Sequence, residues 1–478
     1  MKHQEDKLTA LSRRRFLLRT LAAGAGAAAF GAIPSPLTQL GWAANKAAVG
    51  TLPTQKDRYY IFCYFSGGWD ILLGLDPRDP VKFNKGKVAV TQIDPAYEML
   101  SNPPNDGKPV KLKGAGGKTA EFGPYIGDLA KHFDKFSVVR GMSMDTLTHE
   151  VGRRRFLTGK PPSGLLARGS SGATCLSSLL GETEIIPNLA VRVESYNTDQ
   201  PNFATGLKVS SVPDLLRSLQ IDSAALPANL EQLVNLTVAQ SSGCANAKAS
   251  TMWQGAEMSR QKARAMANGG LDKLFAFQAK TAQMAALRAH YGINASGVAA
   301  LGTPQAQAAM AVTAITAGIS RVCSVQFPIL DAHFDDWATT HGPDQQAGFD
   351  TIARMLEDLA KRSYPGGGTW LDHTTIVAFS EFSRTPMINQ RGGRDHSLTN
   401  ACLLAGAGIK GGQVIGATAD VALAPTKTNL TTGESDDVAG EIIKPEHIYR
   451  TLLHDIGVTA DVTDMRVPAI TALLTKSS

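Results

Sequence analysis

Cysteine is scarce in this sequence, and no two cysteines form a Cys-x-x-Cys pair. The 478 residues include only five cysteines. Because the number is odd and no pair has the spacing of metal ligands, neither a zinc ribbon nor a dense disulfide framework is indicated. Three of the five, Cys63, Cys323 and Cys402, stand in apolar runs and are predicted to be buried as small hydrophobic residues. A disulfide between Cys175 and Cys244 is left open by the sequence.

A strong net charge is also missing once the first residues are set aside. The whole chain has a formal charge of +6, but six basic and two acidic side chains fall within the first 43 residues, which leaves +2 for the rest. A basic patch of the kind that binds nucleic acid is therefore not indicated, and no nucleic-acid partner is expected. Hydrophobic residues make up 43% and charged residues 19%, which is typical of a folded globular protein rather than a disordered one.

No apolar run near the N-terminus is long enough to span a membrane. The stretch Thr20–Ile33 is only weakly apolar and is followed by prolines at 34 and 36. The residues before it, Ser12–Leu17 (SRRRFL), resemble the twin-arginine export motif, and small residues suggest cleavage after Ala43. Residues 1–43 are therefore predicted to be a twin-arginine signal peptide. A basic amphipathic helix or an uncleaved anchor is the alternative.

This prediction makes the export machinery a partner and the mature protein periplasmic or secreted, without a permanent membrane span. Twin-arginine signals are typical of proteins that fold before export, often with a cofactor already bound. We expect the double substitution Arg13→Lys and Arg14→Lys to retain the protein in the cytoplasm, because the paired arginines are the part of the signal that the receptor reads. Fractionation of cells that express both forms tests this, and unchanged export of the double variant would refute the assignment.

Short β-rich runs alternate with helical patterns along most of the chain. This alternation predicts an α/β fold with a mostly parallel sheet and helices on both faces. The predicted strands are Tyr59–Phe65, Phe136–Val139, Val191–Val193, Val322–Leu330, Thr374–Phe379 and Ala401–Leu404. The predicted helices are Tyr125–Lys135, Glu150–Leu157, Gln305–Ala317, Gln345–Arg362 and Pro445–Ile456.

The middle of the chain has a different pattern. Residues 214–302 are rich in Ala, Gln, Leu and Ser and contain no convincing strand, and Met252–Tyr291 indicates one long helix or a helical hairpin. We therefore predict one α/β domain over residues 44–478 that carries residues 214–302 as an all-helical insertion.

Acidic residues and histidines gather near the ends of three predicted elements. Asp331 and His333 follow a predicted strand, and two residues that are two apart in extended chain face the same way. Glu381 follows another strand, and Asp395-His396 follows a glycine turn. In a parallel α/β sheet the loops after the strands gather at one edge, so these five side chains are expected to converge. Carboxylate and imidazole ligands without a thiol favour zinc, manganese, iron, magnesium or calcium.

Longer motifs around these residues resemble an exported bacterial family, domain of unknown function 1501, which is related to the alkaline phosphatase/sulfatase superfamily. The resemblance covers about residues 58–458. It rests on FSGGWD (65–70), LDPR (75–78), THEVGRRRFLTG (148–159), DAHFDDW (331–337), SEFSRTP (380–386), GGRDHS (392–397) and LLAGAGIKGGQVIGAT (403–418). It implies an alkaline-phosphatase-like fold and bound divalent metal ions.

Carried over residue by residue, the resemblance implies metal-ligand roles for several side chains. Asp331 and His333 resemble the acidic and histidine ligands that follow a strand in the superfamily. Glu381 lies where these enzymes place an Asp-His pair, and Asp395-His396 supplies either the later histidine or that pair itself. Asp70 lies near the first strand, where the superfamily keeps a metal-binding aspartate.

The nucleophile departs from the superfamily pattern. Sulfatases carry a Cys or Ser ten residues before the glycine of a Leu-Thr-Gly. In this sequence that glycine is Gly159, and the position ten residues before it holds His149, preceded by Thr148. Histidine serves as a nucleophile or a ligand, and a threonine hydroxyl serves as a nucleophile or as a helix cap. His149 is expected to approach the same pocket as the metal ligands. One of Arg153–Arg155 is expected to face an oxyanion, and Arg384 is expected to add charge stabilisation.

Two functions follow from these patterns. The first is an exported metal-dependent hydrolase that acts on a small-molecule phosphate or sulfate ester. The second is a non-catalytic exported protein that keeps the fold as a binding or assembly module for another exported partner, because a fold does not by itself imply a function.

Overall fold

The computed structural model describes residues 53–220, 227–241 and 250–475. The predicted signal peptide 1–43 and Cys244 lie outside these residues. Cys63, Cys323 and Cys402 are free and buried, as the apolar runs around them predict. Cys175 is also free and buried.

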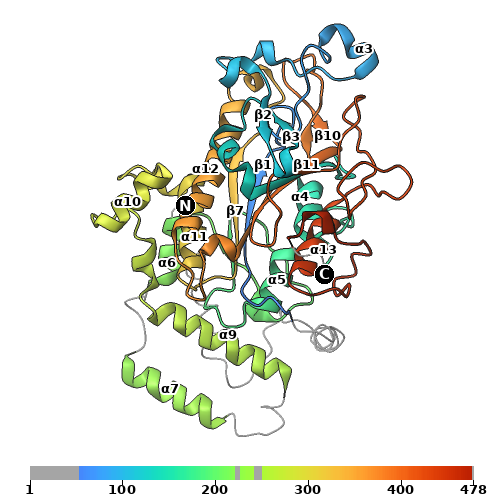
Figure 1. Cartoon of the computed structure of the whole chain (residues 1–478). Coiled ribbons are helices and arrows are strands. Elements are labelled where there is room, and N and C mark those ends of the chain that lie inside the picture. Colours follow the sequence, from blue (N-terminus) through green and yellow to red (C-terminus); the bar gives the residue numbers. More distant parts are fainter. Residues whose placement is uncertain (1–52, 221–226, 242–249, 476–478) are drawn as a thin grey trace, which may run out of the picture.

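An eight-stranded sheet forms the centre of the molecule (Figure 1). Its strand order is β12-β4-β11-β8-β1-β7-β5-β6. The strands are β1 (Tyr59–Ser66), β4 (Phe136–Ser143), β5 (Asn188–Val191), β6 (Leu207–Val209), β7 (Val322–Ile329), β8 (Thr374–Phe379), β11 (Thr399–Gly406) and β12 (Gln413–Ile415). Two small ribbons stand beside it: β2 (Val110–Lys113) with β3 (Thr119–Phe122), and β9 (Ser383–Arg384) with β10 (His396–Ser397).

The sheet is mostly parallel, which confirms the predicted fold class. β1 pairs in parallel with both β7 and β8, and β5 pairs in parallel with β6 and β7. Only β11 runs against its neighbours, β4 and β8. Because β11 is antiparallel to both, β4 points the same way as β8. The C-terminal ends of β1, β4, β7 and β8 therefore lie at one edge of the sheet.

Helices cover both faces of the sheet, because β1 presents apolar side chains to both of them. Tyr59, Ile61, Cys63 and Phe65 join one apolar core, whereas Tyr60, Phe62 and Tyr64 join the other. Successive residues of a strand point to opposite faces, so a strand that is apolar throughout needs a cover on each side. One face packs against α11 (Pro304–Thr316) and α12 (His341–Lys361) and the other against α4 (His149–Thr158), α5 (Gly172–Leu180) and α13 (Pro445–Asp455) (Figure 1).

The described residues between 214 and 302 are helical and contain no strand. They comprise most of α6 (Val212–Leu219), α7 (Ala228–Ser241), α9 (Thr251–Asn268) and α10 (Ala282–Tyr291), with short 3-10 turns between them. Of the two alternatives predicted for Met252–Tyr291, one long helix or a helical hairpin, the single helix is wrong, because the Gly269-Gly270 pair ends α9 and Gly270 takes φ +58°. The boundaries of the insertion remain a prediction.

Several local predictions need correction. Residues 127–135 form 3-10 turns rather than an α-helix, and the strand predicted at 191–193 lies at 188–191. The short strands β2, β3, β6 and β12 have too few apolar residues to stand out in the sequence. Two helices, α3 (Val88–Thr91) and α5, were also not predicted. Among the described residues, no helix has both the length and the apolar character needed to cross a membrane.

Candidate metal centre

Four side chains meet at the C-terminal edge of the sheet in an arrangement that suits a metal ion. His149, Asp331, His333 and His396 each offer one ligand atom, and these atoms all lie within 4.8 Å of one another. The Nε2 atoms of His333 and His396 are 2.9 Å apart. Oδ1 of Asp331 lies 3.3 Å from Nε2 of His333 and 3.6 Å from Nε2 of His149. The four residues therefore form a candidate metal-binding cluster.

The cluster is assembled from three strand ends that meet at one edge. His149 is the first residue of α4, which follows β4, and Asp331 and His333 follow β7. His396 lies in β10, which pairs with β9 just after β8. Gly152 allows α4 to come this close, because a Cβ at that position would lie 2.4 Å from the carbonyl oxygen of Glu381. A larger residue there would push His149 away from the edge.

Each of the three imidazoles is held from behind by an oxygen that accepts a hydrogen bond. Nδ1 of His149 lies 2.8 Å from Oε1 of Glu381, and Nδ1 of His333 lies 2.9 Å from Oδ1 of Asp395. Nδ1 of His396 lies 2.6 Å from the carbonyl oxygen of Leu147. A carbonyl oxygen, like a carboxylate, accepts only, so Nδ1 is the donor and Nε2 of the neutral ring carries a lone pair. All three lone pairs are thus available for a metal.

The two supporting carboxylates are themselves fixed. Oε1 of Glu381 also accepts from the backbone N–H of Gly67 at 2.8 Å, and Oε2 accepts from the hydroxyl of Ser380 at 2.9 Å. Asp395 accepts from the amide of Asn389 at 3.1 Å. The hydrogen bond from His333 lowers the pKa of Asp395, so this carboxylate stays ionised and remains an acceptor. Outer hydrogen bonds of this kind orient imidazole ligands and raise their basicity.

The short distance between two imidazole nitrogens bears on whether a metal ion fits the cluster. With Nδ1 donating in both rings, the Nε2 atoms of His333 and His396 turn two lone pairs toward each other at 2.9 Å. Such a contact is repulsive unless a cation lies between the nitrogens. Two imidazole ligands of a tetrahedral zinc ion, at Zn–N of about 2.0–2.1 Å, are separated by about 3.3 Å. The residues present therefore fit a metal after a small outward shift.

Asp331 is tied to a buried arginine. Nη2 of Arg384 donates to Oδ1 of Asp331 at 2.6 Å and also to the carbonyl oxygen of Gly67. Partial burial alone would raise the pKa of Asp331, but the hydrogen bond and charge of Arg384 outweigh it and lower that pKa. The guanidinium of Arg384 is fully enclosed and lies 5.9 Å from the ring of Phe382. Arg384 therefore positions Asp331, and the structure does not place it where it would touch a substrate.

An aromatic ring forms the floor of the cluster. Phe382 is fully buried, and its ring stacks on His396 with centroids 4.1 Å apart and lies 4.8 Å from His149. Burial lowers the pKa of His396, which keeps that imidazole neutral and able to coordinate a metal. The apolar floor therefore favours the protonation state that metal binding requires.

Asp70 is placed apart from the cluster, in a buried ion pair. Oδ2 of Asp70 lies 3.1 Å from Nε of Arg394, and both side chains are fully buried. The same oxygen accepts from the indole of Trp337 at 2.9 Å, and Oδ1 accepts from the backbone N–H of Leu72. The carboxylate is thus fully used by the protein, and its geometry is that of a structural group.

Thr148 is exposed, and among the described residues its hydroxyl makes no hydrogen bond to the cluster. Its Oγ1 lies 3.4 Å from Oγ1 of Thr146, and it begins α4 without a side-chain capping bond. Of the three arginines that follow, Arg155 is buried against Asp145 and Glu446. Arg154 bonds to Tyr196 and to the carbonyl of Leu165. Arg153, one turn beyond His149 on the same face of the helix, pairs with Glu194 and is the arginine of the three that best fits the predicted anion contact.

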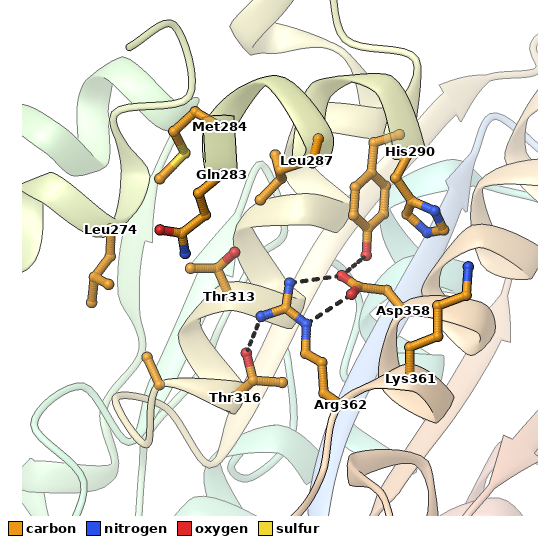
Figure 2. A pocket seen from close by; sticks show the side chains of 13 residues that line it. Leu274, Gln283, Met284, Leu287, His290, Thr313, Thr316, Asp358, Lys361 and Arg362 are labelled. Atoms are coloured by element: carbon orange, nitrogen blue, oxygen red, sulfur yellow. Dashed lines mark hydrogen bonds and ion pairs between the residues drawn. The ribbon is translucent and has the colours of Figure 1, made fainter. Parts of the chain in front are cut away.

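A cavity of about 490 Å³ lies elsewhere, between α10, α11 and α12 (Figure 2). Two of its charged groups, Asp358 and Arg362, are paired with each other. Asp358 accepts from the hydroxyl of Tyr291 at 2.9 Å and from Nε of Arg362 at 2.7 Å, and Arg362 also donates to Thr316 (Figure 2). Apolar side chains such as Leu274 and Met284 form much of the remaining wall. This cavity has no convergent set of metal ligands, so the cluster at the sheet edge is the better candidate site.

Two supporting contacts were not predicted from the sequence. The carbonyl of Leu147 is a backbone atom, and no residue type marks its role. Asn389 donates from its amide to the carbonyl of His333 and to Asp395, and so joins the two loops. A signal for Asn389 existed, because an Asn three residues ahead of a glycine pair suits a turn in which its side chain bonds to the backbone two residues on. Its Oδ1 accepts from the backbone N–H of Arg391 and Gly393.

Comparison with known proteins gives one match at the level of sequence families. The model of a family described as "Protein of unknown function (DUF1501)" matches residues 57–459. A search of the curated proteins finds no match to this chain.

Among solved structures, the similarities are distant. The structure of Ps i-CgsB in complex with k-i-k-neocarrahexaose shares 9% identity at a TM-score of 0.37, covering 86% of this chain and 75% of the other. The structure of Ps i-CgsB without that ligand gives 10% identity at the same TM-score and coverage. The PsFucS1 sulfatase from Pseudoalteromonas sp. shares 12% identity at a TM-score of 0.30, covering 93% and 77%. These values are too low to carry a function over to the chain.

Proposed function

This chain belongs to the DUF1501 family, and we propose that it is an exported metal-dependent hydrolase that acts on phosphate or sulfate esters. One observation carries the proposal. One ligand atom from each of three imidazoles and from the carboxylate of Asp331 converge within 4.8 Å, and all three rings are oriented from behind by acceptors. A histidine cluster that serves only packing has no need for three lone pairs aimed at one point.

The donor set favours one class of metal. Three nitrogens and one oxygen suit zinc or a neighbouring transition metal, whereas magnesium and calcium take oxygen ligands almost exclusively. A tetrahedral ion that takes all four groups has no open position, which is the pattern of a structural site. Because Asp331 is shared with Arg384 at 2.6 Å, three imidazoles would hold the ion and leave its fourth position open to water and substrate. A five-coordinate ion would achieve the same with Asp331 bound.

A metal ion held there would supply Lewis acidity toward an ester oxygen and toward water. Side chains of the protein would supply the proton acceptor and the contact to the anionic oxygens. The hydroxyl of Thr148 bonds to Thr146, so the proposed nucleophile is water rather than that hydroxyl. Asp331, whose pKa is lowered, is the carboxylate of the cluster and is placed to accept the proton of the attacking water. Arg153 lies on the His149 face of α4 and is proposed to contact the anionic oxygens of the ester.

The proposal is tested on protein purified in folded form. Elemental analysis should find about one transition-metal ion per chain, and removal of that ion with a chelator should lower the melting temperature. A screen of aryl and alkyl phosphate and sulfate esters should then detect turnover that the chelator abolishes. Absence of bound metal after incubation with zinc, manganese and iron would overturn the proposal. Metal binding without any turnover would instead support the non-catalytic binding module.

The outer carboxylates give a finer prediction. We expect Asp395→Asn to weaken metal binding about 10- to 100-fold, because an amide is a poorer acceptor for the Nδ1–H of His333 than a carboxylate. Metal affinity measured by competition with a chromogenic chelator checks this. The control is Asp464→Asn, an exposed carboxylate paired with Arg466, which should leave the affinity unchanged. Equal affinities of the two variants would show that Asp395 does not support the metal ligand.

A further inference from the structure

Exposed apolar side chains gather on the segments that carry the metal ligands. Ile329 precedes Asp331, Phe334 follows His333, and Leu398 follows His396 in the chain. Leu147 lies beside His396, because its carbonyl accepts from that ring, and Met387 lies in the loop that follows Arg384. All five side chains are more than a third exposed. Single exposed apolar residues are ordinary, but a group around a candidate site marks a surface that binds something apolar.

Two further exposed leucines lie on a turn that is attached to α4, the helix that begins with His149. Ser163 and Leu166 exchange backbone hydrogen bonds of 3.0 Å across a tight turn, which presents Leu165 and Leu166 side by side at 66% and 74% exposure. Arg154 donates to the carbonyl of Leu165 and so holds this turn against the middle of α4, five residues beyond His149. At a rise of about 1.5 Å per residue, that is roughly 7.5 Å along the helix from His149. We call these seven residues the apolar rim: Leu147, Leu165, Leu166, Ile329, Phe334, Met387 and Leu398.

The charges beside the apolar rim are of both signs. The guanidinium of Arg391 lies 4.7 Å from the ring centroid of Phe334, and the exposed carboxylates of Asp335 and Asp336 follow directly. A surface that recognises a highly charged polymer carries charge of one sign over an extended area. The mixed charges therefore do not favour a polyanion, whereas the apolar side chains favour a molecule that places hydrocarbon next to its reactive group.

We infer that the proposed hydrolase takes esters of apolar alcohols, that is, amphiphilic alkyl or aryl esters whose hydrocarbon part lies on the apolar rim while the anionic head meets the metal-ligand cluster. The inference rests on the proposed function. The reaction is hydrolysis: water adds to phosphorus or sulfur, the bond from that atom to the ester oxygen breaks, and the alcohol leaves with a proton that originates in the water. Arg153 pairs with Glu194, and Arg391 beside Phe334 pairs with Asp395, so each guanidinium would share its charge between that carboxylate and the anionic head.

The inference is tested with four alkyl phosphates that differ only in chain length: ethyl, butyl, hexyl and octyl phosphate. Each is used below its aggregation concentration with metal-loaded protein. Burial of a methylene contributes enough to raise affinity roughly two- to fourfold when it is half to fully covered. We therefore expect octyl phosphate to bind at least about tenfold more tightly than ethyl phosphate by calorimetry, and kcat/KM to rise in parallel. Ile329→Gln combined with Leu398→Gln should flatten this dependence on chain length and leave ethyl phosphate unchanged. Val438→Gln, an exposed valine that is not part of the apolar rim, is the matched control and should leave the whole series unchanged.

The outcomes separate the two proposals. Chain-length-dependent binding without turnover would leave the apolar rim as an amphiphile site and remove the catalytic function. Turnover of ethyl and octyl phosphate with equal kcat/KM would overturn the inference and retain the hydrolase. A response of the double variant only in binding to lipid vesicles, with no change in the soluble series, would assign the apolar rim to a membrane surface and also overturn it.

Discussion

Replacing His333 with alanine is expected to abolish metal binding and hydrolysis while leaving the sheet folded. Its ring contributes the nitrogen that lies closest to two of the other three ligand atoms, 2.9 Å from His396 and 3.3 Å from Asp331. Removing one of three imidazoles leaves two nitrogens and a carboxylate already held by Arg384, which is a poor site for a transition metal. We expect less than about a tenth of the parent metal content after dialysis, and a loss of at least about 100-fold in turnover, in line with the loss of a metal's Lewis acidity.

The matched control is His454→Ala, which removes an imidazole from α13, outside the cluster. That variant should keep the parent metal content. Far-UV circular dichroism should be the same for both variants and the parent, because His333 lies in a loop at the sheet edge and belongs to neither of the two large apolar cores. Full metal content in His333→Ala would show that the cluster is not the metal site.

Replacing Asp70 with alanine is expected to lower the free energy of unfolding by about 3–5 kcal/mol, the typical cost of removing one partner from a buried ion pair. The variant leaves the buried cation of Arg394 without its carboxylate, and it also removes the acceptor of the Trp337 indole and of the Leu72 N–H. Arg394 cannot turn toward water, because its other nitrogens donate to the carbonyls of Thr385, Asp94 and Pro95. An uncompensated charge therefore remains in the interior.

Urea unfolding in the presence of a chelator measures this effect without a contribution from bound metal. The control Asp464→Ala removes an exposed carboxylate from its pair with Arg466 and should change stability by no more than about 0.5 kcal/mol. A loss in Asp70→Ala no larger than that of the control would show that the buried pair does not stabilise the fold.

The central strands could be predicted from the sequence because they are buried on both faces and are therefore mostly apolar along their length. Tyr59–Phe65 is apolar without interruption, and such runs are what a parallel sheet under two layers of helices requires. The edge strand β12 has only three residues, Gln413–Ile415, and its first two are half-buried, so no periodicity develops. Residues 127–135 have helical spacing of apolar residues, but the chain closes into 3-10 turns there, a difference in hydrogen bonding that composition does not encode.

The sequence predicted most of the residues of the candidate site, but not which of them offer ligand atoms to a metal and which support those ligands. Asp331, His333 and His396 stand where an acidic residue and histidines after a strand suggest ligands, and the structure brings them together with His149. Glu381 and Asp395 were predicted as ligands, and the structure places them behind His149 and His333 as hydrogen-bond acceptors. A carboxylate is suited to either role, and only the direction of its side chain separates them. Asp70 faces Arg394 because Trp337 and the turn at Leu72 hold it there, a contact across more than 300 residues that no local pattern reveals.

The ligands come from segments that are far apart in the chain, from His149 to His396, so an unfolded chain has no preformed chelate. The site forms only when the chain folds, so the compartment in which folding is completed determines which metal ions can bind. A chain exported in its folded state, as the twin-arginine motif predicts, would take its metal from the cytoplasm, where free copper and zinc are held low. A chain that folded outside would meet the metals that bind most tightly, with copper ahead of zinc. The metal found in the native protein would therefore record the compartment of folding, and refolding in an equimolar mixture of manganese, zinc and copper would show which ion the site prefers without that restriction.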